Sequence, residues 1–178
     1  MSDGARSPFM NRSFMPSFQH FHQDVEDYLK SEGKCEKNEH GQTVYRGYQP
    51  AFEQLFRTYI EKEAFAPLVA EFRKWNWEWS YDDHLVELTL GLQQARDWPL
   101  LKELWAAVVA KRRTNYNKTK KAQKSVPKKI PEELVHRTRE LLLDSLYRLQ
   151  RYASELGHES DVGAYLEMIV RVEKRLNA

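Results

Sequence analysis

The sequence predicts an all-α protein made of stacked antiparallel helical hairpins. Glycine is scarce, with seven residues among 178, while Leu, Glu, Lys, Arg and Gln, which favour helices, are common. Most hydrophobic residues recur at intervals of three and four, the spacing that places them on one face of a helix. Short connections separate most of the predicted helices, as is typical of helical hairpins. An irregular helical bundle is the alternative arrangement of the same helices.

The N-terminal part of the chain changes character near Ser17. Residues 1–16 lack hydrophobic periodicity, so we expect a flexible N-terminal segment there. Ser17 is a suitable cap for a first helix, and Gly33 lies just past the expected end of that helix. Residues 34–47 are expected to form a loop, in which residues 43–45 can be extended.

Three helical hairpins are expected after this loop. Each expected helix begins with a proline in its first turn or with a capping or acidic residue, the usual signals of a helix start. A glycine follows the first helix of the third hairpin, where a C-terminal cap is needed. The expected starts are Pro50, Pro67, Asp82 or Asp83, Asp97, Pro131, and Ser160 with Asp161, and the glycine is Gly157.

The first two hairpin turns fall near Ala64 and Asp97, about 33 residues apart, which is the period of stacked helix-turn-helix repeats. In rhythm, the central unit at residues 85–108 resembles a tetratricopeptide repeat (TPR). The residues that carry the resemblance are Leu85, Leu88, Leu92, Asp97, Leu101, Trp105 and Val108. The unit departs from the family's pattern where Thr89, Leu101 and Val108 replace small residues. The resemblance implies an α-solenoid rhythm, and no functional residue is transferred from it.

Composition excludes several functional classes. Cys35 is the only cysteine, which excludes a disulfide framework and a four-cysteine zinc site. The glycines form neither G-x-G-x-x-G nor a P-loop pattern. No run of about 18 apolar residues and no secretory signal is present, so we expect a cytoplasmic protein with no membrane association. We expect residues 17–178 to form a single helical domain that is not an enzyme and holds no cofactor and no metal.

Two E-x-x-H pairs are candidate metal ligands. Glu133 with His136 and Glu155 with His158 have the spacing that di-iron helical proteins use. Both pairs are predicted to lie on one helix, where 22 residues separate them by about 33 Å. A shared metal needs pairs on facing helices, so a metal-dependent helical-bundle enzyme ranks third among the functional hypotheses.

An aromatic cluster lies between the first two hairpins. Its aromatic residues alternate along the chain, so an extended connector would place all of them on one side. Such a platform could bind a peptide or stack unpaired bases, or the rings could simply pack between the hairpins. The predicted partner-binding residues are Trp75, Trp77, Trp79 and Tyr81.

A basic stretch lies between the second and third hairpins. Residues 111–129 contain nine basic residues and no acidic one. Removing these nine from the 28 basic residues leaves 19 against 26 acidic ones, so the rest of the chain carries −7 although the whole chain carries +2. We expect a basic loop at 114–130. The predicted phosphate-binding residues are Lys118, Lys120, Lys121, Lys124, Lys128 and Lys129.

These patterns rank two binding functions above the metal enzyme. The first hypothesis is a non-enzymatic helical-repeat adaptor that binds a protein or peptide partner. The second is a nucleic-acid-associated protein that binds phosphates through the basic loop, while a solvated loop or a loop that docks on an acidic protein surface is the alternative.

Overall fold

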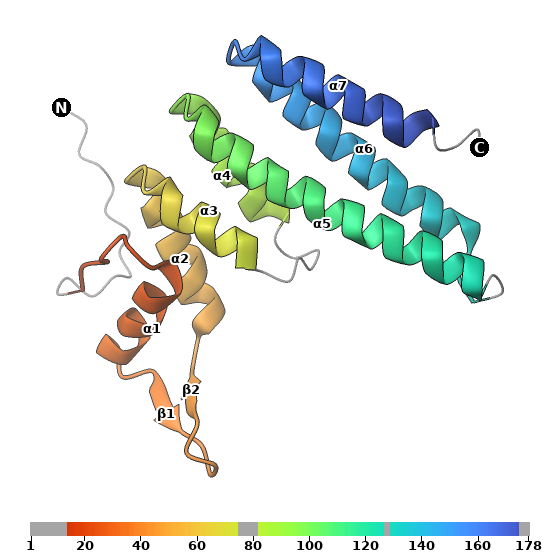
Figure 1. Cartoon of the computed structure of the whole chain (residues 1–178). Coiled ribbons are helices and arrows are strands. Elements are labelled where there is room, and N and C mark those ends of the chain that lie inside the picture. The colour runs from red at the N-terminus through yellow and green to blue at the C-terminus, as the bar shows by residue number, and fades with distance from the viewer. Residues whose placement is uncertain (1–13, 75–81, 127–128, 175–178) are drawn as a thin grey trace. The chain divides into compact units, whose positions relative to one another are not determined.

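The computed structural model describes residues 14–74, 82–126 and 129–174 (Figure 1). The chain divides into two compact units, Met1–Asn76 and Trp77–Ala178. Helices pack on one another within each unit, and the single helical domain expected at 17–178 stays a prediction. Residues 1–13 of the expected flexible segment lie outside the described residues.

The first unit contains helices α1 (Phe21–Ser31), α2 (Tyr48–Glu61) and α3 (Phe65–Lys74). Between α1 and α2, strands β1 (Cys35–Lys37) and β2 (Thr43–Tyr45) pair antiparallel, with Cys35 opposite Tyr45. The extended segment expected at 43–45 is therefore confirmed. The core of this unit is aromatic: the Phe21 ring meets the rings of Phe52, Phe56 and Tyr59 edge-on.

The start of α1 differs from the prediction. Ser17 does not cap the helix, because Phe18 has a positive φ of 57° and the helix begins only at Phe21. The buried carboxylate of Asp24 instead accepts hydrogen bonds from the backbone N–H groups of Ser17 and Phe18, each at 3.0 Å, and from the Tyr59 hydroxyl at 2.5 Å. This carboxylate therefore holds the segment before α1 against α2.

The second unit contains α4 (Asp82–Gln94), α5 (Trp98–Ser125), α6 (Glu132–Glu155) and α7 (Glu159–Lys174). Successive helices pack on each other, and α5 lies beside α6 over much of its length (Figure 1). The cap predicted at Asp97 is confirmed, since its carboxylate accepts a hydrogen bond from the Leu100 N–H at 3.1 Å. Gly157 has a φ of 82°, which suits the glycine predicted after α6.

The predicted all-α class is confirmed, and the helix contacts fit a helical bundle. The hydrophobic faces of α5 and α6 form much of the core of the second unit, with Leu101, Leu104, Leu146 and Leu149 almost fully buried. In the described ranges, none of the helices is both apolar enough and long enough to cross a bilayer.

The loop predicted at 114–130 is wrong over most of its length. Helix α5 continues without interruption to Ser125. Residues 114–125 contain neither proline nor glycine, and Lys, Gln and Ala among them are good helix formers. The buried ring of Tyr116 anchors this part of α5. The polarity of the stretch therefore reflects a solvent-exposed helix surface and not a loop.

Candidate functional site

The C-terminal half of α5 has the highest density of positive charge in the described chain. We call residues 111–125 the basic arm. Seven of its 15 residues are Lys or Arg and none is acidic. From Lys111 to Lys124 these cations span about 20 Å of helix axis, or about one positive charge every 3 Å. This density is comparable with the phosphate density of one nucleic-acid strand, about one per 3.4 Å of duplex axis.

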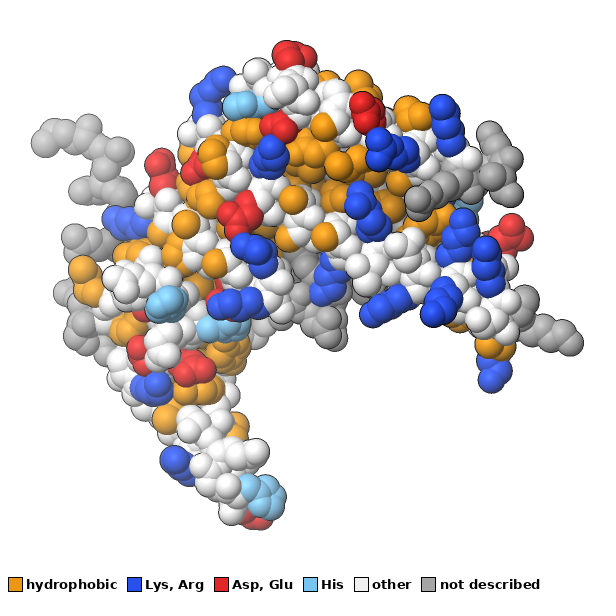
Figure 2. Space-filling view, viewed as in Figure 1, with side chains coloured by type: hydrophobic (Ala, Val, Ile, Leu, Met, Phe, Trp, Pro, Cys, Tyr) orange, Lys and Arg blue, Asp and Glu red, His pale blue; other side chains and the backbone are white. Residues whose placement is uncertain are grey.

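Helical geometry places most of these cations on two sides of the helix. Arg113, Lys120 and Lys124 are separated by seven and four residues, so they lie within about 40° of one another around the axis. Lys111 and Lys118 share a second direction, and Lys121 lies between the two groups. Figure 2 shows several Lys and Arg side chains with few carboxylates over this end of the second unit. Because the arm is helical, its cations form regular rows. A flexible loop would not hold them in fixed positions.

The four arm lysines beyond Tyr116 have no acidic partner among the described residues. No described carboxylate forms an ion pair with Lys118, Lys120, Lys121 or Lys124. The Lys120 ammonium lies 5.8 Å from the centroid of the Tyr116 ring, which favours a cation without neutralising it. Elsewhere on the same helix, Lys102 is paired with Asp161 at 2.7 Å. The arm is therefore available to an external anion.

Two basic residues at the base of the arm have structural contacts. Arg112 Nη1 donates to the Leu141 carbonyl at 2.9 Å and to Asp144 at 3.3 Å, which holds α5 on α6. Burial lowers the pKa of Lys111, because the charged ammonium group is less well solvated there than in an exposed lysine. The exposed lysines beyond Tyr116 are therefore the better candidates for binding anions.

A small pocket lies between α5 and α7, at the base of the arm. Its described lining consists of Arg113, Met168, Arg171 and Val172, and its volume is about 250 Å³. Arg113 Nη2 lies 3.8 Å from Met168 Sδ, and Arg171 pairs with Glu167 at 3.2 Å. Figure 2 shows hydrophobic side chains gathered over this part of the second unit, with Lys and Arg side chains around them. The pocket thus combines two guanidinium groups with an apolar surface.

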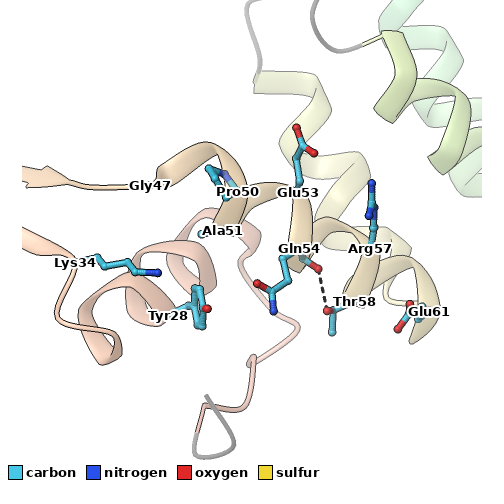
Figure 3. Close-up of a pocket in the computed structure, with 10 residues that line it drawn as sticks. All are labelled: Tyr28, Lys34, Gly47, Pro50, Ala51, Glu53, Gln54, Arg57, Thr58 and Glu61. Carbon is cyan, nitrogen blue, oxygen red and sulfur yellow. Dashed lines mark hydrogen bonds between the residues drawn. The ribbon is translucent and has the colours of Figure 1, made fainter. Parts of the chain in front are cut away.

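A second pocket, of about 620 Å³, lies along α2 in the first unit (Figure 3). Lys34 and Arg57 bring positive charge to its lining, and Glu53 and Glu61 bring negative charge. Gln54 Nε2 is buried and has no described hydrogen-bond partner. Because the charges are mixed, this lining selects no single class of ligand. The remaining lining residues are Tyr28, Gly47, Pro50, Ala51 and Thr58.

The other candidate residues fall into two groups, those outside the described residues and those whose contacts are described. Trp75, Trp77, Trp79 and Tyr81 lie outside the described residues, as does Lys128, while Lys129 is exposed just before α6. In the two E-x-x-H pairs, His136 lies 3.8 Å from Glu140 and His158 stacks on Trp98 with ring centroids 5.0 Å apart. Within the ranges described, no three His, Cys, Asp or Glu side chains are grouped as metal ligands.

A polar cluster of three residues in the first unit, absent from the sequence predictions, joins three helices. His22 Nδ1 forms a short hydrogen bond with the Tyr48 hydroxyl, and its Nε2 lies 3.3 Å from the buried carboxylate of Glu71. The residues come from α1, α2 and α3, so no spacing in the sequence could have indicated the cluster. Phe21 and Phe52 pack beside the imidazole, and the cluster therefore ties the three helices together.

Comparison with protein-family models, curated proteins and solved structures finds no significant match to this chain.

Proposed function

We propose that this protein is a non-enzymatic helical binding module that binds the phosphate backbone of a nucleic acid through its basic arm. One observation carries the proposal: Lys118, Lys120, Lys121 and Lys124 stand on an ordered helix and have no acidic partner in the described chain. This observation ranks nucleic-acid binding above the protein adaptor that the sequence favoured.

The helical conformation of the arm strengthens the electrostatic argument. Ordering a flexible loop on a ligand costs conformational entropy, whereas the arm is already helical before binding. Each lysine that neutralises a phosphate releases condensed counterions into solution. Four such contacts give a slope of about −3 in a plot of log affinity against log salt concentration. Binding is therefore expected to be strong at low salt and independent of base sequence.

The test is fluorescence anisotropy with a labelled oligonucleotide at several salt concentrations. The variant replaces Lys118, Lys120, Lys121 and Lys124 by Gln. The matched control replaces four exposed cations of the first unit, Lys34, Lys37, Arg57 and Lys62, by Gln, which changes the net charge equally. We expect the arm variant to lose at least about tenfold in affinity at low salt and most of the salt slope. The control variant is expected to retain both.

Two results would contradict the proposal. Wild-type protein that binds no oligonucleotide at low salt would exclude nucleic-acid binding altogether. Equal losses in the arm variant and in the control variant would show that net charge alone drives association. Circular dichroism of both variants checks that helix content is unchanged.

A protein partner is the second candidate function, and exposed hydrophobic side chains favour it. Val86 and Leu90 lie one turn apart on α4 and are each 52% exposed, while Leu166 and Val170 form a similar pair on α7. Stacked TPR-like hairpins would present such faces to a peptide or to a further hairpin. A co-purifying chain that is lost from a Val86→Ser, Leu90→Ser variant would support this function. Retention of that chain by the variant would exclude the α4 face.

A further inference from the structure

We infer that the nucleic acid bound by the basic arm is single-stranded and that one unpaired base enters the pocket between α5 and α7. The inference rests on the proposed function and specifies its ligand. It starts from Arg113, which belongs both to the cation row of the arm and to the lining of the pocket.

The first step is the path along α5. Lys124, Lys120 and Arg113 share one side of the helix, at intervals of about 6 Å and about 10 Å along the axis. A strand whose phosphates follow this row from Lys124 arrives at Arg113. The strand is then at the pocket, whose other described lining residues belong to α7.

The second step is the chemistry of the pocket. A volume of about 250 Å³ is below the range of drug-sized ligands, about 300–1,000 Å³, and suits a smaller planar group. Guanidinium planes stack on unpaired bases, and the Met168 thioether makes favourable contacts with aromatic edges. Val172 adds an apolar wall. These are the groups that hold a splayed base beside its own phosphates.

The third step concerns charge at the pocket. Arg171 is paired with Glu167, but both side chains are more than 70% exposed, and such pairs are weak. Arg113 forms no ion pair with a described carboxylate. The lining therefore remains net positive, which fits a nucleotide better than a neutral ligand.

The fourth step explains why the pocket prefers a single strand to a duplex. In a duplex the bases are stacked and paired, so a base reaches a pocket only after it is unstacked and unpaired. The bases of a single strand are already accessible. The arm alone would bind either form, and the pocket adds affinity only for the single strand.

The experiment compares three probes of about 15 nucleotides, near the upper site size of small single-strand-binding domains. They are a mixed-sequence single strand, its duplex, and an abasic strand with the same phosphates. Each is titrated by anisotropy against wild-type protein and against an Arg113→Lys, Arg171→Lys variant. This variant keeps both charges and removes both planar guanidinium groups. A Lys37→Arg, Lys62→Arg variant is the control for lysine–arginine exchange elsewhere.

We expect wild-type protein to bind the single strand at least about fivefold more tightly than the abasic strand, the lower limit for one stacked base. The Arg113→Lys, Arg171→Lys variant should lose that advantage and bind the duplex unchanged. Equal wild-type affinity for the single strand and the abasic strand would overturn the base pocket and leave phosphate binding by the arm standing. Failure to bind any of the three probes would refute the proposed function itself.

Discussion

The two halves of helix α5 contrast in how their side chains are used. Residues 98–110 bury Leu101, Leu104, Trp105 and Val108 in the core of the second unit. Within the described residues 114–125, Tyr116 alone is buried. One continuous helix therefore serves as a packing element at its N-terminal end and as a charged surface at its C-terminal end.

The contrast extends to the cations. Lys102 in the first half donates to Asp161 at 2.7 Å, and the Trp98 indole N–H donates to the same carboxylate at 3.1 Å. Lys120 in the second half has an aromatic neighbour and no described acidic one. Lys102 in the first half is thus paired with a carboxylate of the same chain, whereas the four lysines beyond Tyr116 pair with no described carboxylate. Three stability measurements test this division.

The largest expected effect follows from Leu104→Ala in the first half of α5. Leu104 is fully buried, so the substitution should lower the free energy of unfolding of the second unit by about 2–5 kcal/mol. Urea denaturation followed by circular dichroism measures it. Lys121→Ala in the exposed arm is the matched control and should change stability by less than about 0.5 kcal/mol. Equal losses of stability in the two variants would show that the two halves of α5 do not differ in packing.

An intermediate effect is expected from Tyr116→Ala at the start of the arm. The residue is 7% exposed and is the only buried one among the described residues of the arm, so we expect a loss of about 1–2 kcal/mol. Hydrogen exchange should show faster opening of amides 114–125 and little change in amides 98–110. Tyr116→Phe retains the ring and should retain the protection. Equal acceleration along the whole of α5 would show that the arm and the core half unfold together.

The smallest effect concerns the pH dependence of the Asp161 contact. The Lys102 ammonium and the Trp98 N–H hold the pKa of Asp161 below its ordinary value of 3.8. The charged carboxylate therefore stabilises the folded state above pH 3.8, and this stabilisation is lost as the pH falls through the lowered pKa. Asp161→Asn should cost at most about 1 kcal/mol at pH 7 and less at pH values below 3.8.

Denaturation of this variant and of wild-type protein across the acid range measures the difference. Glu159→Gln also removes a carboxylate from the first turn of α7 and is the control for the helix dipole. If both variants lose the same stability at pH 7, the Lys102–Asp161 contact contributes nothing specific.

Local signals in the sequence predicted much of the fold. The cap at Asp97, the glycine at 157 and the helix start after Pro131 are visible because each depends on a residue and its immediate neighbours. The prediction that Ser17 caps α1 was wrong because it depends on a distant contact. The Asp24 carboxylate, seven residues later, accepts hydrogen bonds from the Ser17 N–H and from the Tyr59 hydroxyl. The loop at 114–130 was wrong because polarity indicates exposure and does not by itself indicate irregular backbone.

The candidate site was predicted in part. The basic residues were recognisable from composition, because an excess of one charge is visible in any stretch of sequence. Their arrangement was not, since it depends on α5 remaining helical to Ser125. The pocket of Arg113, Met168 and Arg171 joins residues more than 50 positions apart, which no local pattern relates.

The sequence by itself determined the helical class, most helix starts and the place of the excess positive charge, because these follow from local propensity, capping and composition. Only the tertiary structure decided which cations have carboxylate partners and which side chains meet across helices. Those outcomes depend on contacts between distant segments, as in the pairing of Lys102 with Asp161 and the packing of His22 against Glu71. The same helix carries both kinds of lysine because Lys102 meets Asp161 of α7, whereas the lysines beyond Tyr116 meet no described carboxylate.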